Sequence, residues 1–344
     1  MAYIQSSILP VVCIHVMGRM VRWTPRQVLG TVGLTLFMTW FLLAITVKNT
    51  TPTATYHPGT PTKDIVEFFH IQRDQYFNLH QYSFSINSRQ CERDDTDVLI
   101  IVHSKPDFFA KRMVIRETFG SANRVDDTPL SIVFMLGRVT NHTLQEQLQK
   151  EAYDFGDMVQ GNFIDHYKNM THKHVMAMHW VGGHCNRAKV IVKIDDDVIV
   201  NPYNLVHYIK RTSKHHNTIH GIVLNSEQPF RNPQAKYYIP YAQYPFDTLP
   251  EYCPGFAYIT TPDVYRKLHE VSRDVRYLNM DDVYVTGVLA LKAGVNKIGI
   301  EKMMFDCGRS KRKLYSLSAY IFVLNEDGAC KLDPHVLWSD VKEK

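Results

Sequence analysis

The sequence predicts an α/β domain with a mostly parallel central sheet, preceded by one transmembrane helix. Three observations support this fold class. Apolar runs alternate with helical segments from about Asp97 onward, the runs are apolar at successive positions as in strands covered on both faces, and one uncharged N-terminal stretch is long enough to cross a bilayer. The chain shows neither an internal repeat nor a GxGxxG or Walker loop.

The uncharged stretch covers residues 28–47 and is rich in Leu, Val, Phe and Trp. At a rise of about 1.5 Å per residue, a helix of this length spans a hydrocarbon core of about 30 Å. Arginines dominate the residues just before it and only Lys48 follows closely, so we expect residues 1–27 to remain cytosolic and the rest to be luminal or extracellular. A cleaved signal peptide is the alternative, but the segment begins late and lacks a small-residue cleavage site.

Residues 48–96 are predicted to form a luminal stem, because their first part is rich in Thr and Pro and poor in apolar residues. Residues 97–344 are long enough for one large domain. The net charge of +5 is dispersed, and no basic stripe interleaved with aromatic residues suggests nucleic acid as a partner. An odd number of cysteines follows the predicted span, which leaves one thiol free or paired with another chain. These cysteines are Cys91, Cys185, Cys253, Cys307 and Cys330.

Within the domain, strands and helices are predicted to alternate. Strands are predicted over residues 98–102, 131–137 and 190–194, and helices over residues 111–118, 143–154 and 283–291. In the second helix Leu144, Leu148 and Ala152 recur at helical spacing. Parallel sheets of this kind bind their ligands at the carboxyl ends of the strands.

Three consecutive aspartates, Asp195, Asp196 and Asp197, stand at such an end, directly after the apolar run of residues 190–194. Carboxylates this close together repel one another unless a metal ion or a proton offsets their charge. The triplet therefore predicts a cation site. An acidic turn after an edge strand is the alternative, but a second apolar run at residues 198–200 follows at once.

Further residues, in this order along the chain, resemble the β-1,3-galactosyltransferase family, a hexosyltransferase group known as glycosyltransferase family 31. They are Arg112, Ile115 to Thr118, Gly120, Phe134 to Gly137, Asp165, Tyr167, Asn169, Lys173, Lys193 to Asp197, Tyr252 to Gly255 and Asp281 to Val283. They cover nearly the whole predicted domain. A lone DxD motif occurs often by chance, whereas a dozen separated matches do not.

The resemblance implies a GT-A domain, a Rossmann-like nucleotide-sugar-binding fold, in a single-pass type II protein of the Golgi membrane. It implies inverting transfer of a hexose from a UDP-sugar to the 3-hydroxyl of an acceptor glycan on a glycoprotein or glycolipid. Galactose is the favoured sugar, and N-acetylglucosamine or N-acetylgalactosamine is the alternative, since an N-acetyl group changes only the shape required of a pocket. An inactive glycan-binding or partner-stabilising membrane protein, alone or in a homo- or hetero-oligomer, is the alternative of another class.

The resemblance also implies roles for the triplet. Departure of UDP leaves growing negative charge that a divalent cation stabilises, and oxygen ligands suit Mn²⁺ or Mg²⁺ better than zinc. Asp197 is then the metal ligand, Asp196 a shared ligand and Asp195 a contact to the donor. The family often supplies a further histidine ligand near the C-terminus, but Leu324 and its neighbours include none, and His335 lies further on.

Inversion needs a carboxylate that accepts the proton of the attacking hydroxyl. Asp281 and Asp282 occupy the place of the family's acidic pair and open the predicted helix over residues 283–291. We expect Asp282 to be the base and Asp281 to orient the base or the acceptor. Helix capping is the alternative, because Asp is favoured at a helix N-terminus.

Three cations are candidates for contacts at the donor site. Arg112 and Arg116 share one face of the first predicted helix, where they bind donor phosphate or form salt bridges to Glu117 or Asp157. Lys193 precedes the triplet inside a strand, where an unpaired ammonium is costly, so we expect it to pair with a carboxylate of the site.

Overall fold

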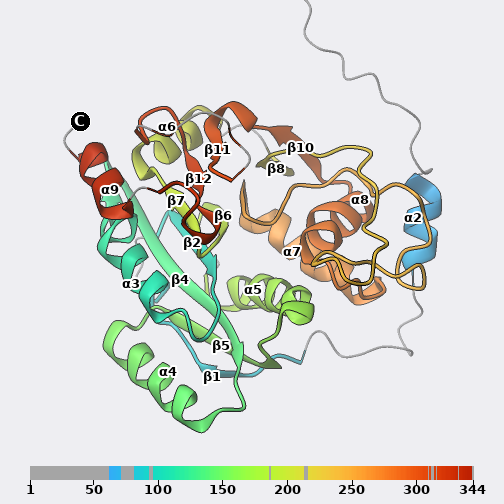
Figure 1. Ribbon diagram of the computed structural model, residues 1–344, viewed down its shortest axis with the longest axis horizontal. Helices are drawn as coiled ribbons and strands as arrows, with labels where there is room; N and C mark the ends of the chain where they lie inside the picture. Colours follow the sequence, from blue (N-terminus) through green and yellow to red (C-terminus); the bar gives the residue numbers. More distant parts are fainter. Residues whose placement is uncertain are drawn as a thin grey trace, which may run out of the picture. The chain divides into compact units, whose positions relative to one another are not determined.

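The computed structural model describes residues 62–70, 81–92, 96–185, 187–212, 216–308, 310, 314, 316–331 and 333–342. All of these lie in one compact unit that spans His57–Lys344 (Figure 1). None of the helices formed by these residues has the length and apolar character needed to cross a membrane. The predicted span over residues 28–47 and the cytosolic segment before it lie outside the described residues.

A mostly parallel sheet forms the centre of the unit and confirms the predicted α/β class. Its strands run in the order β1-β5-β4-β2-β6-β9-β8-β10, with β3 paired to β4. The inner strands β5, β4, β2 and β6 are parallel to one another, whereas β1 is antiparallel to β5 and β9 is antiparallel to both β6 and β8. The strands are β1 (Phe84–Ile86), β2 (Val98–His103), β3 (Arg124–Val125), β4 (Thr128–Arg138), β5 (Met158–Ile164), β6 (Val190–Asp195), β8 (Thr218–Gly221), β9 (Ala257–Thr260) and β10 (Asn296–Gly299).

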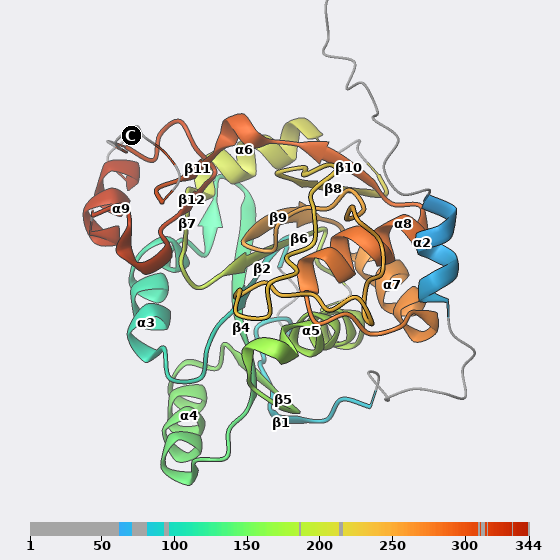
Figure 2. The ribbon, with the colours of Figure 1, turned by 45° about the vertical axis from the view of Figure 1, so that its right-hand side comes forward.

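Helices cover both faces of the sheet (Figures 1 and 2). They are α2 (Thr62–Phe69), α3 (Phe109–Glu117), α4 (His142–Phe155), α5 (Met170–His184), α6 (Pro202–Thr212), α7 (Pro262–Val271), α8 (Ala290–Ala293) and α9 (Pro334–Lys342). Side chains alternate along each strand, so β2 contributes to two hydrophobic cores, one on each face of the sheet. Leu99 and Ile101 belong to the core that includes residues of α2, α5, α7 and α8. Val98, Ile100 and Val102 belong to the core that includes residues of α3, α4, α6 and α9. The continuous apolar runs of the sequence are explained by this double burial.

The ends of α4 show how local sequence sets an element. Asn141 caps the helix by accepting a hydrogen bond from Leu144 N at 3.1 Å, and Gly156 ends it with φ of 67°. Asn is a favoured N-cap, and glycine adopts this left-handed conformation without steric cost. The observed bounds therefore extend the predicted helix by one residue at each end.

Folded elements also occur within residues 48–96, the range predicted as a stem. Helix α2 buries Ile65 and Phe69 against the core, where the Phe69 ring lies 5.9 Å from that of Tyr244. A disulfide joins Cys91 to Cys185 at the end of α5. The described part of the compact unit thus begins before Asp97, because two apolar side chains one helical turn apart are enough to anchor α2.

A second, three-stranded sheet lies at the carboxyl end of β6. It consists of β7 (Val198–Val200), β12 (Phe322–Leu324) and β11 (Met304–Asp306), in the order β11-β12-β7. A disulfide between Cys307 and Cys330 joins the segments that follow β11 and β12. This sheet brings the C-terminal part of the chain to the aspartate triplet, since Asn325 N donates a hydrogen bond to the Asp197 carbonyl at 2.8 Å.

Candidate active site

A cavity of about 1600 Å³ opens at the carboxyl end of β6. Its walls combine acidic side chains, aromatic side chains and the loop that precedes β9. The lining includes Asp195, Asp197, Asp281, Asp282, Gly255, Phe256, Leu324, Tyr167, Tyr237 and Tyr252. The structure therefore brings the two acidic motifs of the sequence, more than eighty residues apart, into one cavity.

The aspartate triplet divides between two environments. Asp195 and Asp197 line the cavity, Asp195 from the end of β6 and Asp197 from the turn between β6 and β7. Asp196 is turned toward the protein, and its two carboxylate oxygens accept hydrogen bonds from the segment after β2, namely from Ser104 Oγ at 2.9 Å, Lys105 N at 3.2 Å and Lys111 Nζ at 3.2 Å. These contacts favour a structural role for Asp196 over the predicted shared metal ligation.

Asp197 has the features of a cation ligand. Its Oδ1 atom is buried and has no hydrogen-bond partner among the described residues. Burial, with the nearby charge of Asp195 next, raises the pKa of Asp197 to about 6. A buried carboxylate oxygen without a partner is costly unless a cation or a proton compensates it. The residue therefore fits an oxygen-ligated divalent cation.

Two further carboxylates, Asp306 and Glu326, line the same cavity. Both come from the C-terminal sheet region, Asp306 from the end of β11 and Glu326 from the turn after β12. Neither was predicted, because neither belongs to a motif. Leu324 borders the cavity at the position where the resemblance leads one to expect histidine, and His335 does not line the cavity, since its Nε2 lies 3.5 Å from Glu117 Oε2 on the exposed surface.

Lys193 is 1% exposed and lies between the two acidic motifs. Its ammonium group donates hydrogen bonds to Asp195 Oδ1 at 2.5 Å and to the Gly255 carbonyl. The predicted pairing of Lys193 with a carboxylate of the site is confirmed. This buried ion pair holds Asp195 at the end of β6 and links β6 to the loop that precedes β9.

Asp282 lines the cavity and also caps the helix that follows it. Its Oδ1 accepts a hydrogen bond from Val283 N at 2.9 Å, and its Oδ2 accepts one from Gly255 N at 3.2 Å. The helix continues as a π-helix over Val283–Leu289, within the predicted helical range. Burial, followed by the charge of Asp281, raises the pKa of Asp282 to about 7. A carboxyl group with this pKa has the proton affinity required of a general base at neutral pH.

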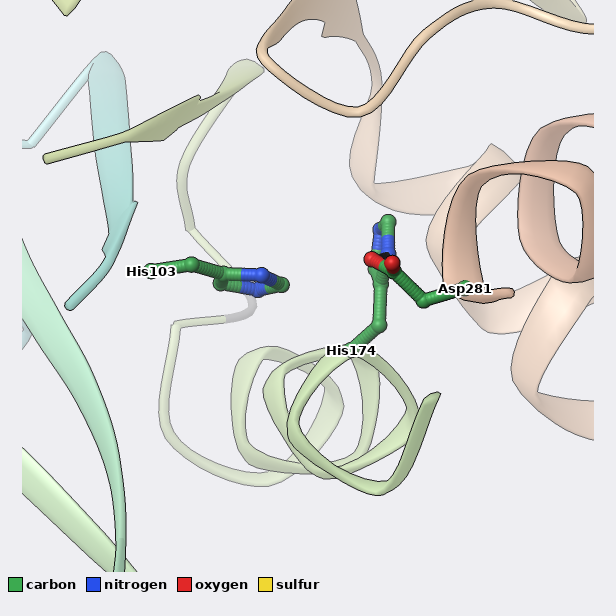
Figure 3. Close-up of side chains that lie close together, drawn as sticks. All are labelled: His103, His174 and Asp281. Atoms are coloured by element: carbon green, nitrogen blue, oxygen red, sulfur yellow. Dashed lines mark hydrogen bonds and ion pairs between the residues drawn. The ribbon is translucent and has the colours of Figure 1, made fainter. Parts of the chain in front are cut away.

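Asp281 has a different environment. Its Oδ2 lies 3.0 Å from His174 Nδ1, and His103 approaches His174 from the other side (Figure 3). Burial alone raises the pKa of Asp281, but the hydrogen bond from His174 and the charge of Lys193 outweigh it, so the pKa lies below its usual value. Ligand atoms of His103, His174 and Asp281 lie within 4.8 Å of one another.

Arg112 and Arg116 do not line the cavity. Arg112 is 0% exposed and forms two parallel hydrogen bonds to Glu151, at 2.9 and 2.7 Å. Arg116 contacts Glu151 at 2.7 Å and Asp157 at 2.8 Å. The structure therefore favours salt bridges over phosphate binding for both arginines, with Asp157 as the sequence suggested and Glu151 in place of Glu117.

The buried Arg112–Glu151 pair gives a stability prediction. We expect Arg112→Met to lower the free energy of unfolding by about 3 kcal/mol, because it leaves part of the Glu151 charge uncompensated in the interior. Chemical denaturation followed by circular dichroism measures this. Lys189→Met, which removes an exposed ion pair with Asp97, is the control and is expected to cost about 0.5 kcal/mol or less. Equal effects of the two variants would contradict the prediction.

Known glycosyltransferases are similar to this chain over most of its length. The family described as galactosyltransferase matches residues 110–301. Beta-1,3-galactosyltransferase 1 of Homo sapiens is 30% identical over 314 residues, covering 89% of this chain and 92% of that protein. Lactosylceramide 1,3-N-acetyl-beta-D-glucosaminyltransferase of Xenopus tropicalis is 33% identical over 235 residues, covering 65% of this chain and 62% of that protein.

Human beta-1,3-galactosyltransferase 9 is 29% identical over 267 residues, covering 77% of this chain and 71% of that protein. Among solved structures, the apo form of the bifunctional glycosyltransferase WbbM matches 62% of this chain and 40% of that one, with a TM-score of 0.36 and 10% identity. That likeness is too distant to bear on the site.

Proposed function

The chain belongs to the galactosyltransferase family, and on this premise we propose that it is an inverting β-1,3-hexosyltransferase with a UDP-sugar as donor. One observation supports the proposal most strongly. A single cavity contains both a carboxylate with an unpartnered buried oxygen, Asp197, and a carboxyl group with the proton affinity of a base, Asp282. Galactose is the favoured donor sugar and a glycan hydroxyl the acceptor.

Asp197 would hold a divalent cation, Mn²⁺ or Mg²⁺, with its unpartnered Oδ1. Such a cation, when bound, stabilises the negative charge of the departing diphosphate. Asp195 lines the same wall and is held by Lys193, which suits a fixed contact to the donor. Asp306 and Glu326 line the same cavity and would serve as further oxygen ligands, in place of the histidine absent near Leu324, by exchanging their contacts with Gly308 N and Lys236 Nζ for the cation.

Asp282 would accept the proton of the acceptor 3-hydroxyl while that oxygen attacks the anomeric carbon and the bond to UDP breaks. The proton passes to Asp282, the electron pair of the broken bond leaves with UDP, and the configuration at the anomeric carbon inverts. Hydrogen bonds from Gly255 N and Val283 N fix the carboxylate before substrate binds. Tyr167, Tyr237 and Tyr252 line the cavity and would supply aromatic surface for the apolar side of a sugar ring, and the ammonium group of Lys236 lies over the rings of Tyr167 and Tyr237.

We further propose that the protein is a single-pass type II protein of the Golgi membrane, with residues 1–27 cytosolic, residues 28–47 spanning the membrane and residues 97–344 forming the luminal catalytic domain. The uncharged stretch supports the span. Disulfides Cys91–Cys185 and Cys307–Cys330 suit an oxidising compartment. Within residues 48–96, the part before α2 would act as the stem.

The proposal is tested by UDP release from the detergent-solubilised full chain. UDP-galactose, UDP-N-acetylglucosamine and UDP-N-acetylgalactosamine are each combined with acceptors that end in galactose, N-acetylgalactosamine, N-acetylglucosamine or xylose, with Mn²⁺ or with EDTA. We expect turnover with UDP-galactose that EDTA abolishes. Turnover with an N-acetylhexosamine donor alone would overturn the choice of galactose, and UDP binding without turnover for any pair would favour the inactive binding protein.

A further inference from the structure

A chain of buried hydrogen bonds leads from the interior to the acidic pair. The Tyr265 and Tyr258 hydroxyls are 2.9 Å apart, the Tyr258 hydroxyl lies 2.5 Å from His174 Nε2, and His174 Nδ1 lies 3.0 Å from Asp281. The three side chains behind Asp281 are fully buried. They come from α5, β9 and α7, so three separate elements fix the arrangement.

The hydrogens of this chain can be assigned. Asp281 is ionised and can only accept, so Nδ1 of His174 carries the hydrogen. Burial lowers the pKa of His174, so its imidazole is neutral and Nε2 accepts the hydrogen bond of the Tyr258 hydroxyl. Tyr258 then accepts from Tyr265. Every hydrogen bond points toward Asp281, and the tautomer of His174 is thereby fixed.

We propose that His174 is a positioning residue of the transfer reaction: held by Tyr258, it orients Asp281 and keeps it ionised beside Asp282. The inference rests on the proposed function. An ionised, fixed Asp281 strengthens Asp282 as a base, because removing the last proton from the pair brings two negative charges together. Asp281 does not itself need to touch the acceptor for this effect.

A metal ion bound by His103, His174 and Asp281 is the competing interpretation of the same cluster. Both nitrogens of His103 are buried without a hydrogen-bond partner in the described part of the chain. However, the rings of His103 and His174 are 4.9 Å apart at 88°, so one ring presents its face to the other, and an imidazole binds metal in its plane. The ammonium group of Lys193 lies close enough to contribute to the lowered pKa of both histidines, and the same positive charge repels a cation here.

The groups around His174 define what a pH experiment reports. They are His103 of β2, Lys193 and Asp195 of β6, Tyr258 of β9, Tyr265 of α7, Lys173 of α5 and the pair Asp281 and Asp282. Among these, Asp282 has a pKa of about 7. We therefore expect the activity of the unaltered protein to rise with pH through about 7, as Asp282 loses its proton.

The experiment compares three variants in the full chain. His174→Leu removes both hydrogen bonds, His174→Asn keeps an N–H donor near the position of Nδ1, and Tyr258→Phe removes only the hydroxyl that fixes the tautomer. Tyr208→Phe is the matched control, since the Tyr208 hydroxyl makes an equally buried hydrogen bond of 2.6 Å to His220 outside the cavity. Rates are measured against pH, together with UDP affinity and circular dichroism.

We expect His174→Leu to lower kcat roughly 10- to 100-fold, as misplacement of a reacting group does, and to leave UDP affinity unchanged. Without the hydrogen bond from His174, Asp281 holds a proton more tightly, so the last proton of the pair moves from Asp282 toward Asp281. Ionisation of both carboxyl groups then requires a higher pH, and the acidic limb shifts upward. His174→Asn restores part of the rate, Tyr258→Phe has a smaller effect in the same direction, and Tyr208→Phe has none.

An unchanged pH profile in His174→Leu, or equal losses in Tyr258→Phe and Tyr208→Phe, would overturn the inference. Stoichiometric zinc in the purified protein that His103→Ala abolishes would establish the metal site instead. If the unaltered protein transfers no sugar, the proposed function fails, and the inference is decided by carboxyl carbon-13 titration. Titration of the pair must then shift in His174→Leu and remain unchanged in Tyr208→Phe.

Discussion

The Asp282→Asn variant is expected to lose about 10³-fold in kcat, within the range that general bases contribute. The amide has the shape of the carboxyl group, and its oxygen retains the hydrogen bond from Val283 N, so the helix end persists, whereas the hydrogen bond from Gly255 N is lost. What is lost is the ability to take the acceptor proton. The measurement is the steady-state rate of UDP release with saturating donor and acceptor.

Binding separates this effect from misfolding. UDP and Mn²⁺ affinities should stay within about twofold of the unaltered protein, because the donor side of the cavity is built from β6. Asp263→Asn is the control, since Asp263 stands in the first turn of α7 and does not line the cavity. Retention of more than about a tenth of kcat in Asp282→Asn would assign the base elsewhere in the pair, with Asp281 as the next candidate.

Asp197→Ala is expected to lower kcat/KM by about 10³-fold, because a Lewis-acidic cation supplies several kcal/mol of charge stabilisation at the leaving group. Mn²⁺ affinity in the presence of UDP should fall in parallel, measured by calorimetry or by the paramagnetic signal of free Mn²⁺. The rate that remains should no longer respond to EDTA.

Asp196→Asn tests the difference between Asp196, which is turned toward the protein, and its two neighbours, which line the cavity. Because the Asp196 oxygens already accept hydrogen bonds from Ser104, Lys105 and Lys111, we expect this variant to lose stability and to retain Mn²⁺ affinity. Loss of Mn²⁺ binding in Asp196→Asn, with retention in Asp197→Ala, would reverse the assignment and restore the ligand role first predicted for Asp196.

The parts of the fold that the sequence predicted are those with a strong local signal. Strands β2, β4 and β6 are buried on both faces and so are apolar over most of their length, and α4 has a cap at each end. The short strands β11 and β12 have three residues each and pair across the chain, which leaves no periodic pattern to recognise.

The site divides in the same way. The triplet and the pair could be identified from the sequence, because carboxylates at consecutive positions must lie close together in any fold and repel one another. The roles of Arg112, Arg116 and His174 depend on partners that lie far away in the sequence. Glu151 is 39 residues from Arg112, and Tyr258 is 84 residues from His174. Asp196 and Asp197 lie in the turn between β6 and β7, so the different environment of Asp196 does not follow from strand alternation and depends on the contacts with Ser104, Lys105 and Lys111.

The free cysteine of the described chain, Cys253, has a consequence for covalent assembly and for dynamics. It is 0% exposed, and burial raises the pKa of its thiol to about 12, so it is neither placed nor activated to bridge two subunits. Its backbone N–H and carbonyl are both tied to Thr286, which also donates to the carbonyl of Asp282. A thiol reagent reaches Cys253 only when the contacts between Cys253 and Thr286 open. The rate at which the thiol is labelled therefore measures local unfolding next to Asp282, the proposed general base.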